Sequence, residues 1–163
     1  MPVLPLTYHP NSLLRATLTR VDLNELRTVK IQKLIDDMTE TMFAKNGIGI
    51  AANQVGKNLS LAILSTDEGP QPVINPRITY RSFRKENDEE GCLSIPGVFG
   101  LVKRHLSITM EAFDRHGKPV TIKAKGLLAR LIQHELDHLN GYLCIDRMTK
   151  VTKGNMPDGK KNV

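Results

Sequence analysis

Residues 126–141 constrain this chain more than any other part of the sequence. Apolar residues recur there at helical spacing, and Asn140-Gly141 supplies a stop, so the segment predicts a helix. Inside it, His134-Glu135-Leu136-Asp137-His138 fits the H-E-x-x-H pattern. In that pattern two histidines one turn apart reach one metal ion, and the glutamate between them addresses the attacking water. The sequence therefore predicts a metal site on this helix.

Five-residue patterns also arise by chance, and the alternative is a helix with two exposed histidines. The two histidines, however, fall on the same helix face as Leu127 and Leu131. An apolar face points toward the interior of a protein, which argues against that alternative.

A catalytic metal site needs a third protein ligand. Asp146 follows the helix closely, but the block Glu90-Gly91-Cys92-Leu93-Ser94 offers a thiolate next to a flexible glycine. A buried apolar cysteine is the structural alternative for Cys92. The chain has two cysteines, Cys92 and Cys144, and we find no export signal, so we expect no disulfide. We predict Cys92, His134 and His138 as the ligands.

Composition limits the other classes of function. The 163 residues are 40% hydrophobic and 25% charged, which is ordinary for one globular domain. The net charge of +6 is spread along the chain without clustered aromatics, so no specific nucleic-acid site is expected. No apolar run reaches the ~18 residues of a membrane span. We therefore expect a cytoplasmic protein that does not enter membranes.

Hydrophobic periodicity predicts the remaining elements. A helix is expected over residues 24–45, strands over 59–64 and 72–80, and a hairpin from 106–113 and 119–125. The charged segment 82–90 is expected to be a loop. We predict one catalytic domain over residues 1–150 and a flexible, frayed tail over 151–163, which is polar and rich in Gly and Asn.

Three blocks together resemble one known family, the peptide deformylases. They are Gly47-Ile48-Gly49-Ile50-Ala51-Ala52-Asn53-Gln54, Glu90-Gly91-Cys92-Leu93-Ser94 and Gln133-His134-Glu135-Leu136-Asp137-His138, in the family's order and at similar spacing. The resemblance extends from about residue 5 to residue 148. It implies an α+β fold in which antiparallel strands surround a central helix that carries the H-E-x-x-H motif.

The resemblance also implies an activity. Deformylases remove the N-formyl group from the formyl-methionyl peptides of newly made proteins and release formate, a step of N-terminal methionine processing. The family uses one divalent metal ion, natively Fe(II), which Zn, Ni or Co can replace. By this resemblance its ligands match Cys92, His134 and His138, which agrees with the chemistry of the residues themselves.

By the same resemblance, Glu135 is the general acid/base of the reaction. The Gln54 side chain and the Leu93 backbone N–H stabilise the negative charge that develops on the formyl oxygen. The alternatives are an ordinary solvated carboxylate for Glu135 and an ordinary polar loop residue for Gln54.

Five residues resemble the family's substrate-binding positions. Ile48 and Gly49 would pair with the substrate backbone from one side and Gly91 from the other, whereas turn glycines are the alternative. Leu127 and Leu131 would line the pocket of the methionine side chain, with core packing as the alternative.

This chain departs from common members at Phe99, where many carry a basic residue near the cleft rim, and at Arg130, where apolar residues are usual. It resembles short forms without the long C-terminal helix that many bacterial relatives dock on the ribosome. We expect a monomer with weak, salt-dependent ribosome association. Two rivals stay open here: a zinc peptidase, and a closed structural zinc site with Cys144 or His105 as fourth ligand.

Overall fold

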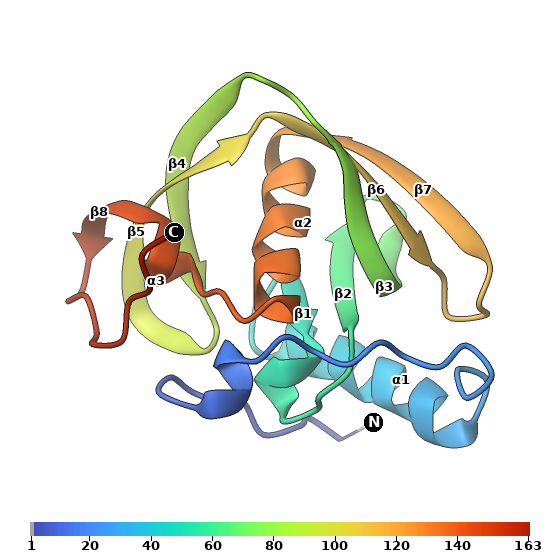
Figure 1. Cartoon of the computed structure of the whole chain (residues 1–163). Helices are drawn as coiled ribbons and strands as arrows, with labels where there is room; N and C mark the ends of the chain where they lie inside the picture. Colours follow the sequence, from blue (N-terminus) through green and yellow to red (C-terminus); the bar gives the residue numbers. More distant parts are fainter. Residues whose placement is uncertain (1) are drawn as a thin grey trace.

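The computed structural model describes residues 2–163 and has an α+β architecture (Figure 1). The N-terminal segment contains a 3-10 turn at Ser12–Arg15, and a second one follows β1 at Ala52–Val55. The helices are α1 (Val29–Ala44), α2 (Gly126–Leu139) and α3 (Cys144–Arg147). The strands are β1 (Gly49–Ala51), β2 (Leu61–Thr66), β3 (Gly69–Arg81), β4 (Lys85–Cys92), β5 (Ile95–His105), β6 (Ser107–Phe113), β7 (Pro119–Lys125) and β8 (Met148–Lys153).

The strands form two antiparallel sheets. The larger has the order β1-β2-β3-β6-β7, and the smaller has the order β4-β5-β8. Figure 1 shows α2 standing between them, so strands surround the helix that carries the H-E-x-x-H motif. The predicted architecture is confirmed.

Alternation along β2 explains why the larger sheet has a helix on each face. Successive side chains of a strand point to opposite faces. Ala62 and Leu64 pack with residues of α2, whereas Leu61 and Ile63 pack with residues of α1. All four are fully buried, which fixes the register of β2, because a slip of one residue would exchange the two faces.

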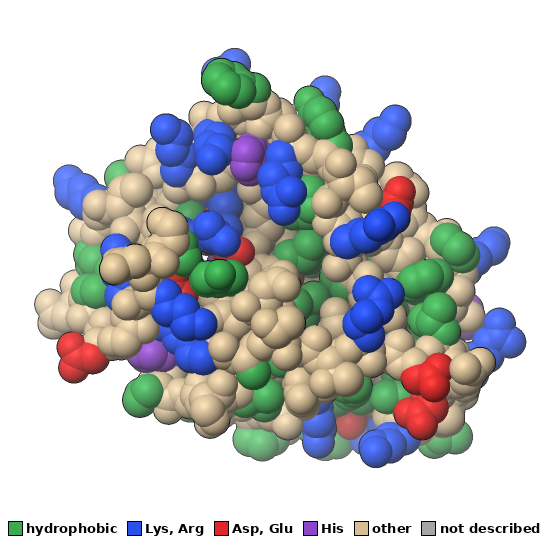
Figure 2. All heavy atoms as spheres, viewed as in Figure 1, with side chains coloured by type: hydrophobic (Ala, Val, Ile, Leu, Met, Phe, Trp, Pro, Cys, Tyr) green, Lys and Arg blue, Asp and Glu red, His purple; other side chains and the backbone are tan. Residues whose placement is uncertain are grey.

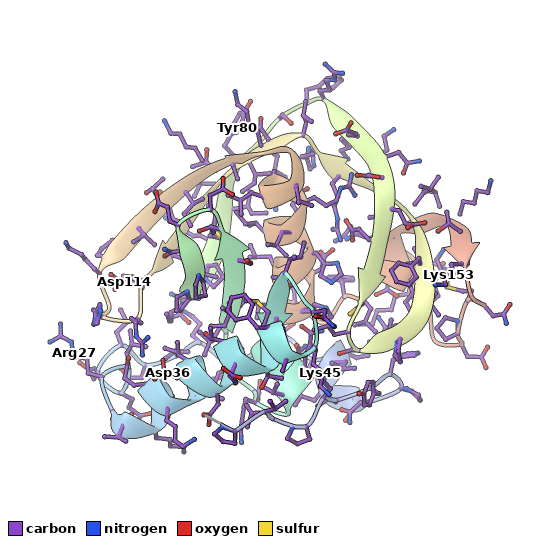
Figure 3. The ribbon with its side chains drawn as sticks, turned by 180° about the vertical axis from the view of Figure 1, so that it is seen from behind. Arg27, Asp36, Lys45, Tyr80, Asp114 and Lys153 are labelled. Carbon is purple, nitrogen blue, oxygen red and sulfur yellow. The ribbon has the colours of Figure 1, made fainter. Side chains whose placement is uncertain are left out.

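The turn between β6 and β7 also contacts α1. Arg115 in this turn pairs with Asp36 at 2.9 Å and donates to Gln32. The view from behind in Figure 3 shows this corner, with Asp36 and Asp114 labelled. The hairpin itself matches the prediction, with Ser107 opposite Lys125.

One element was predicted wrongly. Residues 82–90 were expected to form a loop, but β4 (Lys85–Cys92) is a strand paired along its length with β5. The charged residues of β4 other than the buried Glu90 are exposed, because β4 is an edge strand, and edge strands favour charge as a defence against unwanted pairing. The helix predicted over 24–45 begins only at Val29.

The boundary of the predicted tail is also corrected. Residues 151–153 belong to β8, which pairs with β5. Beyond Lys153 there is no helix or strand up to residue 163, but the backbone N–H of Lys161 donates to Asp146 and the Gly159 carbonyl accepts from Arg15. The flexibility of residues 154–163 stays a prediction.

None of the helices within residues 2–163 combines the length and the apolar character that crossing a membrane requires.

Candidate active site

The three predicted metal ligands lie together. His134 and His138 are one turn apart on α2, and Cys92 is the last residue of β4. Their ligand atoms all lie within 4.8 Å of one another. The Cys92 Sγ is 3.3 Å from His138 Nε2, and the two imidazole rings have centroids 5.0 Å apart. Among residues 2–163, no other group of His, Cys, Asp or Glu comes together in this way.

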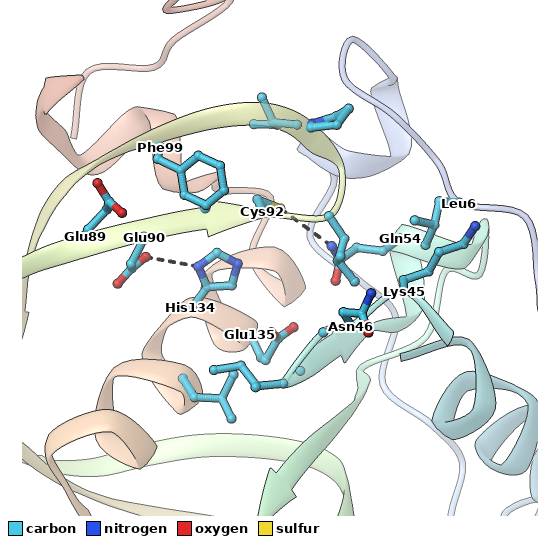
Figure 4. A pocket seen from close by; sticks show the side chains of 18 of the residues that line it. Leu6, Lys45, Asn46, Gln54, Glu89, Glu90, Cys92, Phe99, His134 and Glu135 are labelled. Carbon is cyan, nitrogen blue, oxygen red and sulfur yellow. Dashed lines mark hydrogen bonds and ion pairs between the residues drawn. The ribbon is translucent and has the colours of Figure 1, made fainter. Parts of the chain in front are cut away.

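Glu90 orients His134. Its Oε2 lies 3.0 Å from His134 Nδ1, which leaves Nε2 free to face the cluster (Figure 4). Burial is the largest single effect and would lower the pKa of His134, but the hydrogen bond to Glu90 and the negative charges of Glu135 and Glu90 together raise that pKa to about 9. Burial would conversely raise the pKa of Glu90, but His134 and Arg104 hold it well below its ordinary value. Sequence reasoning missed this role, although Glu90 opens the cysteine block.

His138 is prepared differently. Burial lowers the pKa of His138 well below 6.5, so its imidazole is neutral and carries a lone pair. Its Nδ1 is buried without a hydrogen-bond partner in the described part of the chain. The Asn53 amide holds the helix here by donating to the His138 carbonyl at 2.9 Å.

Cys92 completes a donor set of one sulfur and two nitrogens that fits a divalent transition metal. The neighbouring Cys144 thiol and burial raise the pKa of Cys92 well above 9.0. Such a thiol remains protonated at neutral pH until a cation favours the thiolate. A closed site with four protein ligands is not supported, because neither Cys144 nor His105 joins the group among the described residues.

Glu135 is a buried carboxylate that lines the same cavity as Cys92 and His134. It is 2% exposed, and its Oε2 has no hydrogen-bond partner in residues 2–163. Burial raises the pKa of Glu135 to about 7, although the positive charge on His134 works in the opposite direction. A carboxyl group with a pKa near neutrality can both accept and release a proton, which is what an acid/base catalyst requires.

Gly49 makes room for Glu135. A Cβ at this position would lie 2.4 Å from Glu135 Oε1 and 2.6 Å from Leu131 Cδ1. Both distances are shorter than real contacts, so a side chain at position 49 would push the ends of Glu135 and Leu131 aside, and glycine leaves room for the Glu135 carboxylate. This reason differs from the close approach of a substrate, for which Gly49 was singled out.

The Gln54 amide has a fixed direction. Its Oε1 accepts from the Ala51 backbone N–H at 2.8 Å, and only an oxygen can face that donor. Its NH₂ therefore turns to the site, 3.6 Å from Cys92 Sγ and 3.2 Å from Ser94 Oγ. Figure 4 shows Gln54 directed at Cys92. The role of Ser94 in holding this amide was not predicted.

A cavity of about 570 Å³ opens over the cluster. Every predicted site residue lines it except His138, which is 1% exposed. Ile48 and Leu127 are exposed at its rim, whereas Leu131 is 6% exposed. The residues that line it from the predicted set are Ile48, Gly49, Gln54, Gly91, Cys92, Leu93, Leu127, Leu131, His134 and Glu135.

The cavity has a free sheet edge on each side. β1 is the edge strand of the larger sheet and β4 that of the smaller, and both contribute lining residues. Free edges carry unpaired N–H and C=O groups that can bind an extended peptide as an added strand. On the β4 side, the Phe99 ring covers Gly91, where a Cβ would lie 2.5 Å from the ring.

The fold and the site first define a class. A buried carboxyl group beside one cysteine and two histidines, in an open cavity between two strands, is the arrangement of a metal-dependent hydrolase. The sequence profile of the family described as Polypeptide deformylase matches residues 3–154. The chain belongs to this family, and it is a hydrolase that removes the N-formyl group from formyl-methionyl peptides.

Individual relatives agree. The chain is 42% identical over 158 residues to "Peptide deformylase" of Syntrophobacter fumaroxidans, covering 94% of this chain and 91% of that protein. Among solved structures, the peptide deformylase of Synechococcus elongatus in complex with actinonin is 40% identical, with a TM-score of 0.85 over 92% of this chain and 81% of that one. A class I type b peptide deformylase of Acinetobacter baumannii, bound to Met-Ala-Ser, gives 0.86 at 33% identity over 90% and 100%.

Proposed function

We propose that the reaction is divided among the residues of this cavity as follows. A divalent ion held by Cys92, His134 and His138 supplies Lewis-acid activation when bound. Glu135 takes the proton of the attacking water and delivers it to the amine that leaves as the formyl group is lost. The observation that carries this assignment is the buried Glu135 carboxylate, which lines the same cavity as Cys92 and His134 and has one oxygen without a hydrogen-bond partner among residues 2–163.

Stabilisation of the developing oxyanion falls to Gln54 and Leu93 in this proposal. The Gln54 NH₂ is supported for this role by the Ala51 contact that fixes its direction. Leu93 lies in the turn between β4 and β5 and lines the cavity next to Cys92, so its backbone N–H is the second proposed donor. A neutral amide donates without competing for the cation.

The substrate is proposed to bind as an extended strand between the edges of β1 and β4. Ile48 and Gly49 would contact its backbone on one side and Gly91 on the other. Leu131, with Leu127 at the rim, would contact the first side chain. The support for this proposal is that both free edges border one cavity.

We propose Fe(II) as the native ion, with Zn, Ni or Co as replacements. A ligand set with one soft thiolate and two imidazoles accommodates all of these ions, so the proposal rests on the resemblance to the family rather than on geometry.

Formate release tests the function directly. Protein prepared without oxygen is expected to release formate from formyl-Met-Ala-Ser and to leave the peptide bonds of Met-Ala-Ser intact. Cleavage of the unformylated peptide would instead support a zinc peptidase and contradict the proposal.

We further propose a cytoplasmic monomer that meets its nascent peptides at the ribosome through charge alone. The chain carries a net charge of +6, and Figure 2 shows that the Lys and Arg side chains of one face are spread over it rather than gathered in one patch. Such binding is weak and falls steeply with salt. Co-sedimentation with ribosomes should be detectable at ~0.05 M salt and lost by ~0.2 M. Persistence at the higher concentration would indicate a specific docking element.

A further inference from the structure

Arg130 is a charged residue in a wall of the cavity where aliphatic side chains would be expected. It lies on α2 between Leu127 and Leu131, lines the cavity with them, and is 8% exposed. A buried guanidinium requires hydrogen-bond partners, because an unpaired buried charge is strongly unfavourable.

Three of its five N–H groups have such partners. Arg130 Nη1 donates to Glu90 Oε1 at 2.9 Å and to the Val102 carbonyl at 2.8 Å, and Nη2 donates to the Glu86 carbonyl at 2.9 Å. The Nε–H and the second N–H of Nη2 have no acceptor among residues 2–163. The guanidinium is thus held in place with donors to spare at the cavity wall.

Neutralising Glu90 does not require Arg130. Arg104 already donates to both Glu90 oxygens, from Nε at 2.9 Å and from Nη2 at 3.0 Å, and His134 makes a third contact. Arg104 does not line the cavity. The two arginines therefore share one carboxylate, but only Arg130 faces the space where a substrate would lie.

The position along α2 indicates what Arg130 meets. It lies four residues, about 6 Å, before His134 along the helix axis. The formyl group must sit at the ligand cluster, so the end of a methionine-length side chain directed along α2 reaches the level of Arg130. We propose that Arg130 is a specificity-determining residue that presents a hydrogen-bond donor to the first side chain of the substrate. This inference rests on the proposed substrate orientation.

The donor selects a chemical class. Side chains of methionine length that end in a hydrogen-bond acceptor gain a partner, and a sulfoxide oxygen is a much stronger acceptor than a thioether sulfur. The pocket therefore accepts N-formylmethionine sulfoxide peptides, which an aliphatic wall would reject because the sulfoxide would lose water without compensation. Norleucine, of similar length, offers no acceptor and gains nothing.

The test is a ratio of two substrates measured on each enzyme. The value of kcat/KM is determined for formyl-Met(O)-Ala-Ser and for formyl-Nle-Ala-Ser, in the wild type and in R130M. Hydrogen bonds to charged groups imply that R130M lowers the sulfoxide-to-norleucine ratio by about 10-fold or more. A change common to both substrates, such as a shift of His134 through Glu90, cancels in the ratio.

R104M is the matched control, because it also removes a buried arginine from Glu90 but not from the cavity wall. We expect it to lower both rates alike and to keep the ratio within threefold. A ratio in R130M within threefold of the wild type, or an equal fall in R104M, would overturn the assignment.

If R130M does not fold, R130K replaces it in the test, with the same limits on the sulfoxide-to-norleucine ratio. An ammonium group bound to Glu90 cannot also present a planar donor to the cavity, so R130K should lower this ratio as well. Absence of formate release from formyl-Met-Ala-Ser by the wild type would instead contradict the proposed function, so the two failures are distinguishable.

Discussion

Glu135→Gln is expected to keep the bound metal and to lose formate release by at least about 100-fold, the lower range of general acid–base catalysis. Glutamine has nearly the same shape, so it fits the space beside Gly49 that Glu135 occupies. It cannot take up a proton from water or pass one to the leaving amine. The three ligands are untouched, and metal content should stay stoichiometric.

The same variant carries its own check on folding. In the metal-free protein the pKa of Glu135 is about 7 when folded and near 4.5 when unfolded. A raised carboxyl pKa means that folding stability falls as the pH rises from 4.5 to 7, since the unfolded chain loses the proton first. At about 1.4 kcal/mol per pKa unit this costs about 3 kcal/mol at pH 8. Metal-free E135Q should therefore melt higher than the wild type at pH 8 and almost equally at pH 4.5.

E111Q is the matched control, because Glu111 is an exposed carboxylate on β6 paired with Arg77. It should change neither formate release nor the pH dependence of melting. An E135Q enzyme that retains more than about a tenth of wild-type turnover, with full metal content, would remove Glu135 from its assigned role.

Sequence reasoning selected the three candidate metal ligands, which the structure brings together, because their chemistry is local. The spacing of His134 and His138 fixes them on one side of a helix, and the cysteine next to Gly91 suggested a thiolate that could reach a metal. Such features are visible without a fold. The hairpin of β6 and β7 was likewise predictable, because its side chains alternate, whereas the strands of the second sheet were not predicted.

What sequence reasoning missed depends on contacts between distant residues. Glu90 contacts His134, which is 44 residues away in the sequence, and Arg130, which is 40 residues away. β4 lacks an alternating pattern, because its exposed edge is charged. Because residues 82–90 were not recognised as a strand, there was no reason to place Glu90 opposite α2. The contact of Glu90 with His134 was therefore missed for the same reason as β4 itself.

Gly49 shows that a residue selected for one reason can be constrained by a different contact. It was selected as a residue that lets a peptide approach, whereas the nearest atoms to a Cβ there belong to Glu135 and Leu131. A side chain at position 49 would displace both of these side chains even without a substrate. Arg130 was noticed only as a departure from the family, and its partners appear only when β4 and β5 are folded beside α2.

Cys92→Ala is expected to abolish stoichiometric metal binding and, with it, formate release. The substitution removes the only sulfur of the ligand cluster, whose Sγ lies 3.3 Å from His138 Nε2. Two imidazoles remain, and one of them, His134, has a pKa of about 9 through Glu90, so protons compete for it at neutral pH. Metal content after dialysis, measured by elemental analysis, should fall below about a tenth of one equivalent, since a chelate that loses its charged, soft ligand weakens by orders of magnitude.

Cys92→Asp separates charge from softness. Its carboxylate restores a negative ligand, and we expect it to hold zinc while releasing formate much more slowly than the wild type, because an oxygen ligand is harder and alters the geometry of the site.

Cys144→Ala is the matched control for Cys92→Ala. Cys144 is 2% exposed, packs in the apolar cluster of α3 and β5, and stands outside the ligand group. Removing it should leave metal content and turnover within about twofold, well under the ~1.4 kcal/mol of a tenfold effect. Full metal in Cys92→Ala would show that the third ligand is misassigned, and loss of metal in Cys144→Ala would return the closed four-ligand site to consideration.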